Sequence, residues 1–137
     1  MQKRINHNPR ISGGIYFINN VTPLILGNDW VPLTNFIDMS PNLYFSLENN
    51  KLKYIKGKSV LPCNISWSMS IKSENEFKAR LINGRVISEI KDVALFTKVI
   101  GNNSFQKILL NESFGIEVCS EIKQEILISS AFITISE

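Results

Sequence analysis

The residues able to perform acid–base or nucleophilic chemistry are few in this chain and far apart. His7 is the only histidine, and it lies in the basic head "MQKRINHNPR". A Ser-His-Asp or Cys-His arrangement would have to draw on a residue outside the predicted fold. Two carboxylates from distant strands could still meet as a glycosidase pair, but nothing in their spacing favours one. We therefore predict no enzyme activity and no catalytic residues, and a carbohydrate-active hydrolase is the weakest alternative.

Motifs that bind metals or phosphate-containing cofactors are absent from the sequence. It contains no glycine-rich phosphate loop, no H-E-x-x-H motif and no cluster of acidic ligands. Glu74 and Glu76 bracket a polar loop, for which a solvated turn is a better explanation than a weak calcium site. Cys63 and Cys119 start on opposite faces of their predicted strands, which favours two free thiols over a disulfide, and no second ligand set suggests zinc. We predict neither a metal nor a cofactor.

The positive charge of the chain is concentrated near its start. The formal excess of +3 equals the charges of Lys3, Arg4 and Arg10, which leaves twelve basic and twelve acidic residues in 11–137. A nucleic-acid-binding domain would carry a basic excess in its folded body, because affinity depends largely on neutralising phosphates. We therefore predict no nucleic-acid binding. Residues 1–13 are interpreted as a basic arm, either solvated or ordered on a partner, and residues 14–137 as one domain.

A run of lysines raises the question of nucleic acid a second time. Four of them lie within eight residues, from Lys51 to Lys58, directly after the segment "NLYFSLENN". In a β-hairpin, Leu52 and Tyr54 would face a core while the alternate lysines point to solvent. Exposed lysines keep a strand soluble and discourage pairing at sheet edges. This interpretation is favoured over a basic, aromatic patch for nucleic acid.

Alternation of apolar and polar residues dominates the sequence and predicts β-strands. No segment shows a sustained helical stripe, and no apolar run reaches the length of about 20 residues that spans a membrane, so we predict no membrane insertion. Asn49-Asn50 and Asn83-Gly84 are signals of two-residue hairpin turns. The spacing of short strands indicates an antiparallel sandwich or jelly roll. The predicted strands cover residues 15–18, 24–26, 30–33, 43–48, 51–56, 65–72, 77–82, 85–90, 93–100, 105–110, 114–121 and 125–136.

The segment "NISWSMSIK" predicts part of the core. Its apolar residues, Trp67 and Met69 among them, alternate with serine, asparagine and lysine. One face of this strand is therefore expected to be buried. We predict that Trp67 and Met69 pack between two sheets against Phe45 and Leu52.

The closing strand "EILISSAFITISE" is largely apolar on both faces. Even-numbered residues from Ile126 to Thr134 form one face, and odd-numbered residues from Leu127 to Ile135 form the other. A sandwich strand needs only one apolar face, so another subunit or a loop of the same chain should cover the second. A single β-bulge would exchange the two faces. Another subunit is favoured, and the predicted interface comprises Tyr16, Ile18, Leu127, Ala131, Ile133 and Ile135.

The order of several segments resembles a known family. A Trp-Val-Pro-Leu segment at residues 30–33 precedes the hairpin "NLYFSLENNKLKYIKG", the serine-alternating strand, the turn in "RLINGRVI", the late pair "KILLNESFGIEV" and the apolar closing strand. In this order they resemble the TNF/C1q-like jelly-roll heads of bacteriophage head fibres, tail fibres and capsid decoration proteins, over about residues 14–137. The resemblance implies an all-β, ten-stranded antiparallel sandwich that forms a homotrimer around a threefold axis, with its first, third, sixth and last strands on the inner sheet. It implies no enzyme activity.

These observations lead to an expected role in a virion. We expect a structural protein, either a trimeric fibre head or a capsid decoration protein, displayed on the particle surface. Its arm would attach it to other capsid or tail proteins through Lys3, Arg4 and Arg10. The alternative is a receptor- or glycan-binding module of a tail fibre that contacts a host surface, which exposed aromatic residues in loops would favour.

Overall fold

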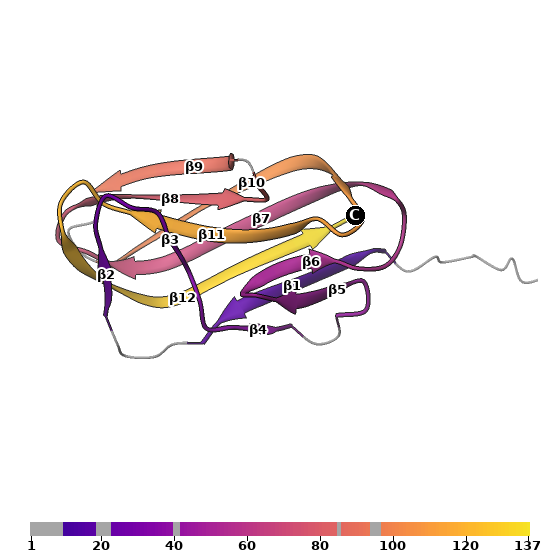
Figure 1. Cartoon of the computed structure of the whole chain (residues 1–137), viewed down its shortest axis with the longest axis horizontal. Coiled ribbons are helices and arrows are strands. Elements are labelled where there is room, and N and C mark those ends of the chain that lie inside the picture. Colours follow the sequence, from indigo (N-terminus) through magenta and orange to yellow (C-terminus); the bar gives the residue numbers. More distant parts are fainter. Residues whose placement is uncertain (1–9, 19–22, 40–41, 85, 94–96) are drawn as a thin grey trace, which may run out of the picture.

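The computed structural model describes residues 10–18, 23–39, 42–84, 86–93 and 97–137, and these form strands without helices (Figure 1). This part of the chain contains no helix with the length and apolar character needed to cross a bilayer. The strands are β1 (Ser12–Phe17), β2 (Leu24–Leu26), β3 (Val31–Pro32), β4 (Phe36–Asp38), β5 (Phe45–Glu48), β6 (Lys51–Tyr54), β7 (Val60–Lys72), β8 (Glu76–Ile82), β9 (Val86–Val93), β10 (Thr97–Leu109), β11 (Ser113–Cys119) and β12 (Gln124–Ser136).

The strands form two antiparallel sheets that pack face to face. The first, called here the β7/β12 sheet, has the order β10-β7-β12-β1-β4, with β2 paired to β12. The second, called the β8/β11 sheet, has the order β5-β6-β11-β8-β9, with β3 paired to β11. The first and last strands of the chain are neighbours in one sheet, as the resemblance implied. The predicted all-β jelly-roll sandwich is confirmed.

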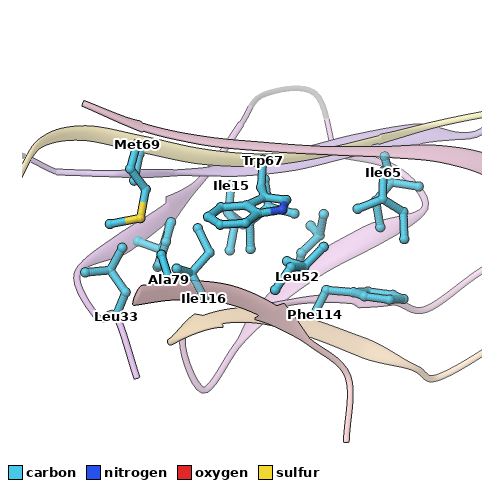
Figure 2. Close-up of a cluster of buried hydrophobic side chains, with 14 of the residues drawn as sticks. Ile15, Leu33, Leu52, Ile65, Trp67, Met69, Ala79, Phe114 and Ile116 are labelled. Atoms are coloured by element: carbon cyan, nitrogen blue, oxygen red, sulfur yellow. The ribbon is translucent and has the colours of Figure 1, made fainter. Parts of the chain in front are cut away.

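The core lies between the sheets and is built by alternating residues of facing strands (Figure 2). Trp67 and Met69 point from β7 toward Leu52 and the residues of the opposite sheet. All three side chains are at most 1% exposed, as is Phe45. The prediction that Trp67 and Met69 lie between the sheets, in one core with Phe45 and Leu52, is therefore confirmed. Successive side chains of a strand face opposite ways, so the alternation in the sequence identifies the buried face.

The β5–β6 hairpin has the predicted turn. Phe45 pairs with Tyr54 and Glu48 with Lys51, which leaves Asn49 and Asn50 as the two turn residues. Both asparagines have positive φ, 51° and 59°, as a type I′ turn requires. The predicted assignment of the lysines is also supported, because Lys53 points away from the core and makes an ion pair with Glu48 at 3.3 Å.

Several predicted strands differ from the structure; β7, for example, begins at Val60 and not at residue 65. Residues 93–100 and 105–110 were expected as two strands, but β10 runs without a break from Thr97 to Leu109. Pairing with β7 along its whole length holds Gly101-Asn102-Asn103 extended, so these turn-forming residues do not turn. The short strand β4 was not predicted at all. The β8–β9 hairpin exists, but Ile82 pairs with Val86, so its loop is longer than two residues.

The closing strand β12 contains the β-bulge on which its buried face depends. Ile128 pairs with Ile71, and Ser130 pairs with Ser70. Ser129 between them has no partner on β7 and is the extra residue. Before the bulge the buried residues are even-numbered, Ile126 and Ile128, and after it they are odd-numbered. Both apolar runs of the strand can thereby face the same core.

The folded body begins before residue 14. Ile11 is buried, and β1 begins at Ser12. Residues 11–13 therefore belong to the sandwich, whereas the sequence pattern assigned them to the arm.

Candidate functional site

The outward surface of the β7/β12 sheet is the strongest candidate for a functional surface. Directly paired residues of antiparallel strands share a face of the sheet. The pairs Gly101–Ser68, Ser68–Phe132, Phe132–Tyr16 and Tyr16–Ile37 therefore form one row across five strands. Trp67 and Met69 on either side of Ser68 point into the core, so this row points away from it.

The rows beside it have the same character. Asn103, Ser66, Thr134 and Gly14 form the next row, and Ser70 pairs with Ser130 on the other side. None of the described residues at these outward positions carries a charge. Beyond them, Lys72 on β7 and Lys107 on β10 lie at positions that alternate in step with this face. We call this surface the neutral face, and define it by Ser12, Gly14, Tyr16, Ile37, Asn64, Ser66, Ser68, Ser70, Gly101, Asn103, Phe105, Ser130, Phe132, Thr134 and Ser136.

The outward surface of the β8/β11 sheet differs because it is charged. Arg80 donates hydrogen bonds from Nε and Nη2 to Oε1 of Glu117, at 2.9 and 2.7 Å. Its guanidinium also lies 3.9 Å from the centroid of the Trp30 ring, in a cation–π contact. The Arg80 guanidinium is therefore already paired within the chain, with Glu117 and Trp30. Among the described residues, the lack of charge is therefore specific to the β7/β12 sheet and is not shared by the outward surface of the β8/β11 sheet.

The predicted interface residues are separated by the bulge. Tyr16, Ile18 and Leu127 are exposed, as expected for an external surface. Ala131, Ile133 and Ile135 instead lie in the core, at most 2% exposed, so their assignment to the outer face is corrected. The extra residue in β12 exchanges the faces beyond residue 129. Phe132 and Thr134 take the outward positions, and the sequence pattern assigned both to the core.

The serine-alternating strand carried a signal that the sequence analysis did not use. Ser66, Ser68 and Ser70 occupy successive outward positions of β7, where a strand exposed to water commonly has lysine, glutamate or arginine. This run of small, uncharged residues distinguishes the outward side of β7 from a charged strand surface. Combined with the correct register of β12, it would have located the neutral face.

The predicted anchor residues are only partly described. Lys3 and Arg4 lie outside the described residues, whereas Arg10 is exposed. Immediately after it, the amide of Ile11 donates to Oε1 of Glu137 at 3.2 Å, and the Glu137 amide donates to the Ile11 carbonyl at 2.8 Å. Lys58 Nζ donates to the other carboxylate oxygen of Glu137. These hydrogen bonds lower the pKa of the Glu137 carboxyl, Lys58 contributing most.

The cysteines and carboxylates of the described residues form few groupings with catalytic potential. Cys63 and Cys119 are free and buried, and burial raises the pKa of the Cys63 thiol to about 11. Within the described residues, no group of three or more His, Cys, Asp or Glu side chains is placed to hold a metal. A hollow of about 460 Å³ near the start of β12 contains two carboxylates, Glu74 and Glu125, but Lys72 and Lys123 line it as well. This mixed lining does not lead us to propose a hydrolase.

Solved structures with the same fold come from several biological settings. Eiger TNF from S. frugiperda has a TM-score of 0.72 and 8% identity, over 95% of this chain and 93% of its own. PRD1 vertex protein P5 has a TM-score of 0.58 and 9% identity, over 95% of this chain and 99% of its own. The globular domain of zebrafish complement 1qA protein has a TM-score of 0.58 and 13% identity, over 90% of this chain and 94% of its own. The chain thus has the jelly-roll fold of TNF and C1q.

The sequence comparisons add no closer relationship. No protein-family model matches the chain, and no curated protein sequence matches it. At these low identities the structural likeness establishes the fold alone, and one of the similar structures is a viral vertex protein.

Proposed function

We propose that this chain is a structural protein of a virion, assembled as a homotrimer through the neutral face and displayed as a fibre head or capsid decoration on the particle. We propose no catalytic activity. The observation that carries the proposal is the row Ser68–Phe132–Tyr16–Ile37, which is uncharged, partly aromatic and outward-facing.

The composition of the neutral face supports an interface between protein chains. The cores of such interfaces are depleted in charged residues and enriched in aromatic ones. Phe132 and Tyr16 are adjacent on β12 and β1, and small serines on β7 flank them. Large aromatic side chains beside small residues can fill a partner's surface while allowing its backbone to approach.

A second copy of the same chain is the partner that we propose. Cyclic oligomers repeat one contact until the ring closes, so one neutral face in each copy is sufficient. The threefold arrangement is the one that the family resemblance implies. In such a trimer Tyr16, Ile18 and Leu127 remain interface residues, together with Phe132 in place of Ala131, Ile133 and Ile135.

The virion setting is supported by two further observations. PRD1 vertex protein P5 has the same fold across almost the whole of both chains. The positive excess of this chain is confined to Lys3, Arg4 and Arg10, beside a charge-balanced body, which suits an arm that binds other capsid or tail proteins.

A receptor- or glycan-binding module is less well supported. Sugars stack on exposed aromatic rings, but Arg80 already covers one face of Trp30 in the segment before β3. We therefore do not propose it as a second function.

Two matched serine substitutions test the assembly. Ser68→Arg places a charge on the neutral face, and Ser46→Arg places the same charge on the outward surface of β5, beside Glu48. In sedimentation velocity, the unchanged chain and Ser46→Arg should be trimers, whereas Ser68→Arg should be a folded monomer. A monomeric unchanged chain, or a trimeric Ser68→Arg variant, would contradict assembly through this face.

The virion assignment has its own test. Particles purified from the source of the chain should contain it in a fixed copy number when analysed by quantitative mass spectrometry. Immunogold labelling should place it on the surface of intact particles. Absence of the chain from purified particles would contradict this part of the proposal.

A further inference from the structure

One end of the sandwich combines exposed aliphatic side chains with basic ones. It is the end where β12 finishes, on the right in Figure 1, together with the β6–β7 connection and the β10–β11 turn. The aliphatic side chains there are between 36% and 66% exposed. We call this surface the base end and define its apolar part by Leu43, Ile55, Val60, Leu109 and Leu110.

Backbone hydrogen bonds bring these residues together from four segments. The amides of Ile55 and Lys56 both donate to the Tyr44 carbonyl, next to Leu43. The Leu110 amide donates to the Ser59 carbonyl, and Leu109 pairs with Val60 across β10 and β7. These five exposed side chains therefore lie together at one end of the sandwich.

The charges at the base end are predominantly positive. Lys56, Lys107 and Arg10 are exposed, and no ion pair holds them within the part of the chain that the structure describes. Lys58 is neutralised by Glu137. Glu112 is engaged internally, because its carboxylate accepts hydrogen bonds from the Leu109 amide, at 2.6 Å, and from the Asn83 side chain. The base end therefore presents more basic than acidic groups around an apolar centre, since Lys56, Lys107 and Arg10 outnumber Glu112.

The base end is also where the chain enters the folded body. Ile11 is hydrogen-bonded to Glu137. Its side chain also lies so close to Gly57 that a Cβ atom at that position would be only 2.9 Å from the Ile11 Cδ1 atom. Arg10 precedes this contact directly. A partner that binds the chain before Ile11 would lie against the base end.

We infer that the base end is a docking surface for a protein that is acidic and has exposed apolar side chains. This inference rests on the proposed function, in which that protein is the particle component that carries the head. The basic groups select an acidic surface, and the aliphatic centre has the apolar, uncharged composition of an interface core. Aliphatic side chains suit a protein better than nucleic acid, where aromatic residues would stack on bases.

The chain offers a matched pair of variants for the test. Ile55-Lys56 is an exposed Ile-Lys pair at the base end, and Ile122-Lys123 is an exposed Ile-Lys pair before β12. Because β12 extends over 13 residues along the sandwich, the second pair lies at the opposite end. The double variants are Ile55→Ser with Lys56→Glu, and Ile122→Ser with Lys123→Glu. Sedimentation and thermal unfolding of both should match the unchanged chain, since all four side chains are exposed.

The probe is a purified particle from which the native chain has been stripped, and the readout is rebinding of the full-length chain. The unchanged chain and the Ile122/Lys123 variant should rebind equally. The Ile55/Lys56 variant should rebind about tenfold more weakly or worse, the loss expected when central interface residues are replaced. Binding of the unchanged chain should also weaken as salt is raised.

The remaining outcomes distinguish a failure of the proposed function from a failure of the docking inference. If the unchanged chain does not rebind, the proposed function fails, and the docking inference fails with it. If it rebinds and the Ile55/Lys56 variant rebinds equally, the docking inference alone is wrong. Two further probes are compared: vesicles that contain phosphatidylserine, and, separately, duplex DNA. If the unchanged chain and the Ile122/Lys123 variant bind one of these probes at physiological salt and the Ile55/Lys56 variant does not, the inferred partner is wrong. The base end would then bind a lipid surface or a nucleic acid and not an acidic protein.

Discussion

The Ser129 hydroxyl donates a hydrogen bond to the Ser70 carbonyl oxygen at 3.1 Å, at the point where β12 bulges. The bulge interrupts the ladder between β7 and β12, and the serine side chain satisfies a carbonyl at this interruption. The bulge itself matters for the whole molecule, because the extra residue determines which residues of β12 enter the core and which join the neutral face.

The hydrogen bond and the extra residue can be tested separately. Ser129→Ala should lower the free energy of unfolding by about 1 kcal/mol, the net contribution of a typical hydrogen bond. Deletion of Ser129 should leave the domain folded, because Ile128 and Ala131 would then be two positions apart and both apolar runs of β12 would still face the core. Urea unfolding measures the first, and circular dichroism the second. A deletion of Ser129 that does not fold would show that the bulge itself is required.

Adjacent residues after the bulge should respond oppositely to the same change. Ile133→Lys should unfold the domain, because it buries an amine at a position with no exposure. Phe132→Lys should leave the domain folded and, if the neutral face is the interface, monomeric. Thermal unfolding and sedimentation of the two variants distinguish these results. The reverse pattern would mean that the register of β12 is inverted.

The Trp67 side chain should be one of the largest single contributors to stability. It is 1% exposed between the sheets, and truncation of a buried large side chain to alanine costs about 3–5 kcal/mol. Trp67→Ala should therefore show this loss in chemical denaturation. Ile25→Ala, at an exposed site, should change stability by no more than about 0.5 kcal/mol. Equal effects of the two substitutions would be incompatible with the core described.

The Glu137 carboxylate should make stability depend on acid pH. Its pKa is lowered in the folded chain by Lys58 and Ile11. A lowered folded pKa adds stability above the unfolded value of about 4.3, and this addition disappears as the pH falls through the folded pKa. At neutral pH, Glu137→Gln should thus be less stable than the unchanged chain, and the difference should vanish on acidification. Unfolding midpoints between pH 7 and pH 3 measure it, with Glu125→Gln as control; a difference independent of pH would exclude this linkage.

The turn between β5 and β6 should discriminate between substitutions by backbone conformation. Asn50 has φ 59°, which glycine adopts freely and a β-branched residue adopts at a cost of about 1–2 kcal/mol. Asn50→Gly should raise the thermal midpoint slightly, and Asn50→Val should lower it. Asn28→Val, at an exposed bend residue outside the left-handed region, should have little effect. Similar midpoints for both Asn50 variants would show that the turn is not type I′ in solution.

Local patterns determined the parts of this fold that depend on neighbouring residues. Alternation along "NISWSMSIK" placed Trp67 and Met69 in the core, since successive side chains of a strand must face opposite ways. The Asn49-Asn50 turn was predicted because few residues tolerate two successive positive φ angles. The absence of helical periodicity and the even spacing of strands predicted an antiparallel sandwich or jelly roll, and the resemblance to TNF/C1q-like heads favoured the jelly roll.

Long-range pairing decided the rest. Gly101-Asn102-Asn103 would form a turn in isolation, but ladder pairing with β7 holds it extended. The apolar residues of β12 occur on both faces, so the strand alone cannot specify which face is buried; β7 specifies it by pairing on either side of Ser129. Because a one-residue shift inverts every later side chain, this contact between distant segments places Ile133 in the core and Phe132 on the neutral face.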